Sequence, residues 1–358
     1  MQSKNNIETK DDQIYYNISI VNNDLVSKVV NFQQQLTGNI IDDPNDYYLS
    51  CIRFYLNGTS MPLFLFPNPS PYYVSLTYKT FSAQAALAYV PQPTSIYPQP
   101  VYEYQYFADL VNTALKQCFT NLGLASGGTL PVGSVAPYIL YNPKTTKFEV
   151  YAQIANYDES ITYPISLYMN ESLFALFNNF WVQYYGQNLP TRQDYRIRIL
   201  NLYGQNSAPL DPSVPTGYYR MDQEWINLTP FWEPVSIVFK TNRMGVRSEY
   251  IQGANLTTNL NSAVNPGTGI PYDNVMTDFI PAFGYGDAAG WRTDLTYYPT
   301  SQYRLIDLLG SQSNYIDLSI FWKNQQGVEY PYVISPNTSV SVKLAFVKKS
   351  LYKNYKKN

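Results

Sequence analysis

The chain ends in SVSVKLAFVKKSLYKNYKKN, residues 339–358, and the first half of this stretch decides the fold class. Small or polar residues alternate there with four apolar ones, Val340, Val342, Leu344 and Phe346. This period of two predicts a β-strand with one buried face. The second half carries five lysines, two tyrosines and no acidic residue: Lys348, Lys349, Tyr352, Lys353, Tyr355, Lys356 and Lys357. The pattern therefore predicts a closing strand followed by a basic tail.

Short runs of the same kind recur along the chain. They are rich in β-branched and aromatic residues, and Pro, Asn or Gly bounds each of them. The runs cover residues 14–21, 47–56, 72–81, 138–141, 147–154, 165–169, 195–203, 234–241, 304–309, 315–322, 330–334 and 339–347. Roughly a dozen short strands at this spacing predict an all-β fold, namely a sandwich, a jelly roll or a barrel.

Two segments depart from the β pattern and predict inserted amphipathic helices, at about 104–122 and 171–181. The first has apolar residues at steps of three and four, and Gly123 follows it as a stop signal. The second begins after Asn170, a good helix-capping residue, and has Glu171 in its first turn. We expect both helices to cover the core of the β domain.

The predicted domain organisation has three parts. Residues 1–12 are polar and show no apolar period, which indicates a flexible N-terminal arm. Residues 13–347 form the β-rich domain, in which the region at about 205–300 is compatible with a large loop insertion or a second β subdomain. Residues 348–358 form the basic C-terminal tail.

Positive charge is concentrated at the C-terminus. Nineteen of the 24 Lys and Arg residues lie in residues 1–347, together with all 26 acidic residues. The chain before the tail therefore carries a net negative charge. Basic arms on acidic bodies commonly contact nucleic acid or an acidic partner, although a tail that only aids solubility fits equally well. The candidate contact residues are Lys348, Lys349, Lys353, Lys356 and Lys357, with Tyr352 and Tyr355 as stacking partners.

The chain contains no histidine, which removes Ser-His-Asp and Cys-His catalysis and histidine-ligated metal sites. Its two cysteines, Cys51 and Cys118, are far apart and predict neither a disulfide framework nor a thiolate metal site. No phosphate-binding loop occurs either. We expect no catalytic residues, no cofactor and no metal.

Carboxylate chemistry would survive the loss of histidine, because a glycosidase needs only two acidic residues. The candidates for this role are Asp158 with Glu159, Asp222 and Glu224 near Trp225, and Glu233 beside Trp232. Acidic pairs arise routinely by chance in a chain with 26 such residues. An enzyme therefore ranks below a binding or structural protein.

The N-terminal sequence MQSKNNIETKDDQIYY has no apolar core of a secretion signal, and no run is long enough to span a membrane. With so few cysteines, a reducing compartment, the cytoplasm or the nucleus, is the expected place of synthesis.

Taken together, the polar arm, the Tyr-, Pro- and Asn-rich body of short strands and the inserted helix resemble jelly-roll capsid proteins of small icosahedral DNA viruses of eukaryotes. The closing segment carries most of this likeness: IDLSIFWKNQQGVEYPYVISPNTSVSVKLAFVKK, residues 316–349, has two strands flanking an NQQG turn and a third ending in paired lysines. The resemblance implies a structural virion protein of major, minor or vertex type. It would assemble with itself or with other capsid subunits into the shell, and its tail would contact the genome or a neighbouring subunit.

The alternative from another functional class is a non-enzymatic β-sandwich module that binds glycans or a receptor through its long loops. Aromatic faces stack on sugar rings without any catalyst, so a Tyr-rich surface fits this interpretation as well.

Overall fold

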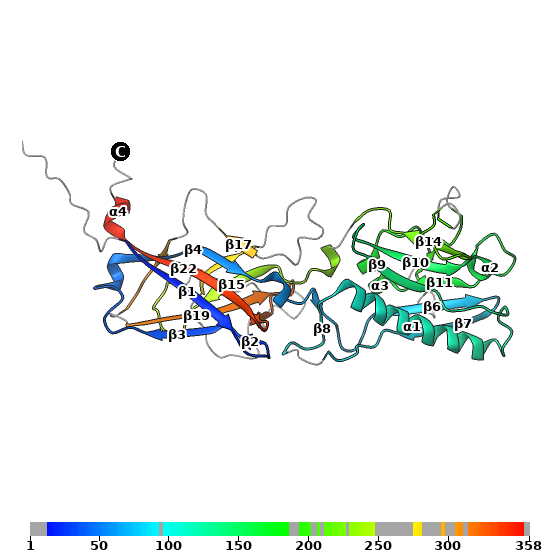
Figure 1. Cartoon of the computed structure of the whole chain (residues 1–358), viewed down its shortest axis with the longest axis horizontal. Helices are drawn as coiled ribbons and strands as arrows, with labels where there is room; N and C mark the ends of the chain where they lie inside the picture. Colours follow the sequence, from blue (N-terminus) through cyan, green and yellow to red (C-terminus); the bar gives the residue numbers. More distant parts are fainter. Residues whose placement is uncertain are drawn as a thin grey trace, which may run out of the picture. The chain divides into compact units, whose positions relative to one another are not determined.

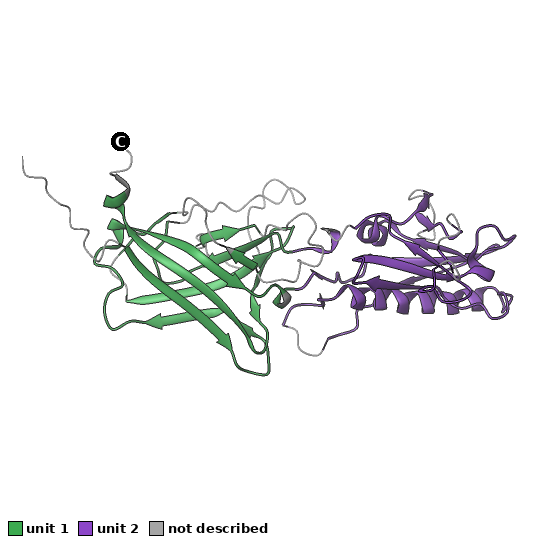
Figure 2. Ribbon diagram, turned by 45° about the horizontal axis from the view of Figure 1, so that its top comes forward, with its two compact units in different colours: residues 1–61, 234–284, 291–358 green, residues 62–233, 285–290 purple. Residues whose placement is uncertain are grey.

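The computed structural model describes residues 13–92, 96–185, 193–201, 206–207, 211–226, 229–247, 275–280, 295–297, 305–310 and 314–353. The expected arm at 1–12 and much of the region at 205–300 lie outside these ranges. The chain divides into two compact units (Figure 2). Unit 1 contains residues 1–61, 234–284 and 291–358, and unit 2 contains residues 62–233 and 285–290. Most of the second unit is formed by residues 62–233.

Unit 1 is a sandwich of two antiparallel sheets (Figure 1). The first sheet has the order β1-β22-β4-β17, with β18 also pairing with β4. The second has the order β16-β15-β19-β20, with β3 also pairing with β19. The strands are β1 (Gln13–Asn22), β3 (Asn31–Gln35), β4 (Tyr47–Leu56), β15 (Ser236–Lys240), β16 (Val275–Phe279), β17 (Leu295–Tyr297), β18 (Ile306–Asp307), β19 (Tyr315–Lys323), β20 (Glu329–Pro331) and β22 (Thr338–Lys348).

The pairing of these strands is that of a jelly roll. If β17 and β18 count as one interrupted strand and β20 is set aside, eight strands follow one another along the chain. The first pairs with the eighth (β1·β22), the second with the seventh (β3·β19), the third with the sixth (β4·β17 and β4·β18), and the fourth with the fifth (β15·β16). A long hairpin rolled into two Greek keys gives this nested order. Unit 2 is inserted between the third and fourth of these strands.

Alternating apolar residues close the sandwich of unit 1. Val340, Val342, Leu344 and Phe346 of β22 are all buried, which confirms the strand predicted from the closing segment. Between the sheets, the Phe54 ring of β4 lies with its centroid 5.3 Å from Phe239 of β15 and 4.8 Å from Phe279 of β16. The period of two thus directs one side-chain set of each strand into a common core.

Two further pairs of short elements decorate unit 1. The strand β2 (Lys28–Val29) pairs with β21 (Val333–Ile334), and the single-turn helices η1 (Pro44–Asp46) and η2 (Gly58–Ser60) flank β4. The closing strand β22 leads directly into a short helix, α4 (Lys349–Lys353). The first residues of the predicted tail are therefore the end of a strand and one helical turn.

Unit 2 contains a three-stranded sheet of order β14-β10-β9, a five-stranded sheet of order β12-β13-β11-β6-β7 and the pair β5-β8. The long helix α1 packs against β6, β7 and β9. The strands are β5 (Phe64–Leu65), β6 (Tyr73–Tyr78), β7 (Phe81–Ala86), β8 (Pro100–Val101), β9 (Tyr138–Asn142), β10 (Lys147–Gln153), β11 (Ser166–Met169), β12 (Val182–Tyr184), β13 (Tyr195–Ile197) and β14 (Tyr218–Asp222). The helices are α1 (Tyr104–Ala125), α2 (Ile154–Tyr157), α3 (Glu171–Phe177) and η3 (Thr229–Phe231).

Both predicted helices are present, but their ends differ from the expectation. The first continues past Gly123 to Ala125, because the left-handed residues that stop it are Gly127 and Gly128, with φ of +61° and +79°. The second ends at Phe177 instead of residue 181. There Asn179 leaves the helix, and its backbone carbonyl accepts a hydrogen bond from Glu224 N at 2.8 Å.

An aromatic cluster forms the core of unit 2. Phe148 of β10 lies with its ring centroid 4.8 Å from Phe177 of α3 and 5.3 Å from Phe231 of η3. Phe107 of α1 joins the same cluster, 5.4 Å from Phe231. All four side chains are fully buried. The helices predicted from their apolar faces thus contribute directly to this core.

Candidate functional site

The C-terminal end of the jelly roll is the first candidate site, because the predicted basic tail begins there. The helix α4 turns back onto the outer face of the first sheet, where Leu351 packs against Ile52, Ala345 and Val347. Ile52 lies at an irregularity in β4, where the register with β22 shifts between Lys343 and Leu344. The start of the tail is therefore anchored by apolar contacts.

Charged and aromatic side chains fix Lys349 beside this apolar cluster. Its ammonium group lies 2.7 Å from the Oδ1 of Asp307 in β18 and 5.0 Å from the ring centroid of Tyr48. Lys348 lies over the ring of Tyr47 at 5.9 Å. Part of the predicted positive charge thus interacts within the chain.

The remaining predicted contact residues are only partly described. Tyr352 and Lys353 belong to α4, for which the structure gives the backbone of these two positions. Tyr355, Lys356 and Lys357 lie outside the described residues. The sequence did not predict Asp307, Tyr48 or Leu351 as parts of this site. One available signal was the run LAFV at 344–347, where the alternation breaks down and both faces of the strand become apolar.

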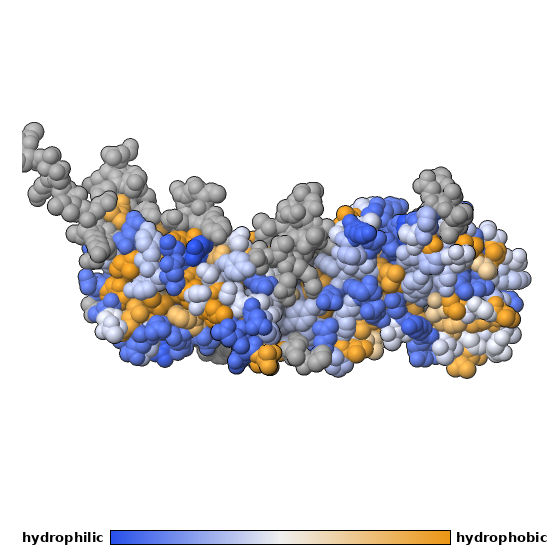
Figure 3. Space-filling model, viewed as in Figure 1, coloured by the Kyte–Doolittle hydropathy of each residue, from blue (hydrophilic) through white to orange (hydrophobic). Residues whose placement is uncertain are grey.

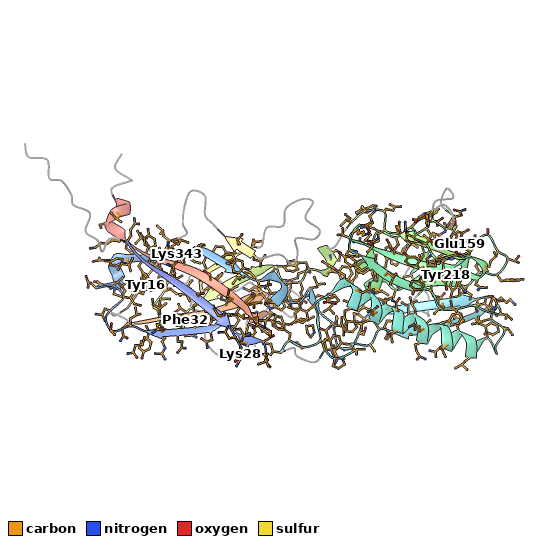
Figure 4. All side chains as sticks on the ribbon, viewed as in Figure 1. Tyr16, Lys28, Phe32, Glu159, Tyr218 and Lys343 are labelled. Carbon is orange, nitrogen blue, oxygen red and sulfur yellow. The ribbon has the colours of Figure 1, made fainter. Side chains whose placement is uncertain are left out.

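Asp158 and Glu159, two of the candidates for glycosidase chemistry, form hydrogen bonds within unit 2. The Glu159 carboxylate accepts a hydrogen bond from Arg198 Nε at 2.7 Å and another from Ile199 N at 3.3 Å. The neighbouring Asp158 accepts from the hydroxyl of Tyr219 at 2.8 Å and from Ser160 N at 2.8 Å. Burial alone would raise the Asp158 pKa, but these hydrogen bonds outweigh it and the pKa is lowered. Figure 4 labels Glu159 in this part of unit 2.

Asp222 and Glu233 have structural partners as well, and Glu224 contributes its backbone carbonyl, which accepts from Lys147 Nζ at 3.0 Å. Asp222 accepts from Arg220 Nε at 2.8 Å and faces Glu149 in the register of β14 and β10. Burial and the Glu149 charge raise the Asp222 pKa although Arg220 opposes them. The Glu233 carboxylate accepts from Leu65 N at 2.6 Å, and its backbone N–H donates to Leu63 O at 2.8 Å. These contacts tie the two ends of the segment 62–233 together.

No group of three or more His, Cys, Asp or Glu residues in the part of the chain that the structure describes is arranged to hold a metal ion. No helix among the described residues is long and apolar enough to cross a membrane.

Comparison with known sequences identifies relatives among virophage structural proteins. The family model described as Sputnik minor capsid protein V18/19 matches residues 14–348. The chain is 32% identical over 217 residues to structural protein V19 of Sputnik virophage, which covers 60% of this chain and 94% of V19. It is also 31% identical over 157 residues to protein V18 of the same virophage, covering 36% of this chain and 90% of V18.

Solved structures show the same relationship. A chain in the cryo-EM structure of the Sputnik virophage matches 95% of this chain and 99% of its own length, with a TM-score of 0.74 and 29% identity. The mavirus penton protein shares the fold, with a TM-score of 0.65, 16% identity and coverage of 94% and 99%. These matches favour a structural virion role over the glycan- or receptor-binding alternative. The chain belongs to the Sputnik minor capsid protein V18/19 family, and it is a jelly-roll structural protein of the virion.

Proposed function

We propose that this chain is the vertex subunit of an icosahedral shell and has no enzymatic activity. The observation that carries the proposal is a single jelly roll, interrupted by one inserted unit, in a chain whose family assembles into virions. The solved mavirus protein with the same fold is a penton protein. A vertex ring needs a subunit that joins copies of itself as well as the neighbouring shell proteins.

The vertex position is tested by imaging particles in which the chain carries a compact tag at Val132, a fully exposed residue of unit 2. Cryo-EM reconstruction should place the tag density around the five-fold axes. The matched control carries the same tag on a major shell protein and should show density over the facets. Tag density for this chain on the facets would contradict the vertex proposal.

The C-terminal tail contacts the packaged genome or a neighbouring subunit through residues that follow Leu351, which packs against the first sheet. Lys349 is paired with Asp307, so the contacts would come mainly from Lys353, Lys356 and Lys357, with Tyr352 and Tyr355 as stacking partners. Because each lysine that contacts a phosphate releases counterions, replacing three lysines by alanine should reduce the slope of log K against log[salt] by about 2–3.

A filter-binding assay with single- and double-stranded DNA over a salt series measures this slope. The control variant replaces Lys116 and Lys144, two exposed lysines of unit 2, by alanine. The control should keep the slope of the native chain. Equal slopes for the native chain and the tail variant would exclude the genome contact and leave a neighbouring subunit as the partner of the tail.

A further inference from the structure

One side of the jelly roll has an unusual composition for a free protein surface. It is formed by β1, the connection 23–30 and β3, and it is called here the β1–β3 side, residues 13–35. Over these 23 positions the only charged residues are Asp24 and Lys28, whose charged groups pair with each other at 2.7 Å. Within residues 13–35 the two charges compensate each other, and the nearby ammonium group of Lys343 in β22 lies over the Tyr15 ring at 4.8 Å.

The same side exposes apolar residues. Tyr15, Val21, Leu25, Val26 and Val29 are all exposed, and Leu25 reaches 90% exposure. Figure 3 shows hydrophobic surface at the β2 end of this side, and Figure 4 labels Tyr16, Phe32 and Lys28 along it. Clusters of exposed apolar side chains are typical of surfaces that bind another protein.

The exposed apolar connection is held in place. The buried Asn22 side chain donates to Val26 O and Ile334 O, both at 2.9 Å, and accepts from Asp24 N at 3.1 Å. The strand pair β2·β21 and the hydrogen bond from Val30 N to Tyr332 O add further support. A surface fixed before binding loses less conformational entropy when a partner docks.

The backbone of β1 also has hydrogen-bonding capacity to offer. Among the described strands, β1 lies at the edge of its sheet: one side of it pairs with β22 in an uninterrupted ten-residue register, and no described strand pairs with the opposite side. It contains no lysine, no proline and no bulge, which are the devices that normally block an edge strand. It is also the longest edge strand among the described residues. An edge of this kind is a template for adding a strand from another chain.

We propose that the β1–β3 side is the surface on which a second copy of this chain docks, with a strand of that copy adding to the edge of β1. This inference rests on the proposed vertex function, because a vertex ring requires contacts between identical copies. A ten-residue strand is about 33 Å long and two sheet layers lie about 10 Å apart, so the edge covers roughly 330 Å² in projection, somewhat under half of the ~800 Å² that each partner buries in a standard interface, and the exposed connection 23–30 adds to this area. A neutral, partly apolar surface suits a copy of the same chain better than a charged partner.

A charge variant tests the interface without disturbing the core. Ser19→Lys with Leu25→Asp places two charges at exposed positions of the β1–β3 side. The matched control, Ser82→Lys with Leu124→Asp, places the same charges at an exposed position of the unit 2 edge strand β7 and at Leu124, which is 77% exposed. Sedimentation velocity over a concentration series measures self-association of the full chain, and hydrogen exchange measures protection of the peptides from 13–35.

The native chain should self-associate, and peptides from 13–35 should gain protection as the oligomer forms. The β1–β3 variant should raise the dissociation constant at least about tenfold, whereas the control should match the native chain. A native chain that stays monomeric, an oligomer in which 13–35 exchanges as in the monomer, or a control as impaired as the variant would each overturn the proposal. Tag density at the five-fold axes would still support the vertex function in any of these cases, so the two failures are distinguishable.

Discussion

Replacing Phe148 by alanine should destabilise unit 2 by about 3–5 kcal/mol and leave the stability of the jelly roll unchanged. Phe148 is fully buried, and its ring centroid lies 4.8 Å from Phe177 and 5.3 Å from Phe231 and Tyr141. The substitution removes the transfer free energy of the ring and leaves a cavity that these neighbours fill only in part. Every ring that contacts Phe148 belongs to the segment 62–233, so the loss should be confined to unit 2.

Hydrogen exchange in a urea series measures the stability of each unit separately, because each proteolytic peptide belongs to one unit. With an m-value of about 2–3 kcal/mol/M, the urea midpoint of unit 2 should fall by roughly 1–2 M. The milder variant Phe148→Leu should cost about 1 kcal/mol. The mirror variant Phe239→Ala should lower the midpoint of the jelly roll instead. If Phe148→Ala lowered the protection of both units equally, the division into two independently stabilised cores would be refuted.

Three further predictions concern polar contacts within the two units. Asp317 in β19 is only 1% exposed, and its carboxylate accepts hydrogen bonds from the Thr241 hydroxyl and from Asn242 N. Asp317→Asn should therefore lower the free energy of unfolding of the jelly roll by about 2–3 kcal/mol. The measurement is the urea midpoint of the jelly roll, and an unchanged midpoint would contradict this prediction. Asn170→Ala removes the side chain that caps α3 and should lower the free energy of unfolding of unit 2 by about 1–2 kcal/mol. Asn170→Asp is the control, because aspartate also caps helices. Equal losses in the two variants would rule out the capping role. The folded-state pKa of Asp158 is lowered, so its stabilisation exists above its unfolded pKa of about 3.9 and is lost as the pH falls through the folded value. Thermal unfolding of unit 2 should therefore depend less on pH below about 4 in Asp158→Asn than in the native chain, and identical pH profiles would refute this.

Much of the fold could be predicted from residue periodicity, because an alternating strand and an amphipathic helix each carry a local signal. The turn between β6 and β7 could not. The run at 72–81 reads as one strand, but the chain reverses at Lys79 and Thr80, with Lys79 at a positive φ of 53°. Neither residue type signals such a turn, so only tertiary pairing of Tyr78 with Phe81 reveals it.

The division into two units was also hidden from the sequence. Residues 62–233 have the same Tyr-rich β composition as the jelly roll, so no shift in composition marks their boundaries. The signal lies in three dimensions, where Glu233 binds the backbone of Leu63 and Leu65 and joins the two ends of the insertion. The positive charge of the tail is evident from the sequence. The pairing of Lys349 with Asp307 is not, because it depends on two strands that are far apart in the chain.

The most direct test of the proposed role is a cryo-EM reconstruction of particles that contain this chain. The proposed vertex function predicts rings of single jelly rolls at the five-fold axes, each carrying one inserted unit with the order β14-β10-β9 in its smaller sheet. Density for this chain on the facets, or particles whose vertices are filled without it, would contradict that function.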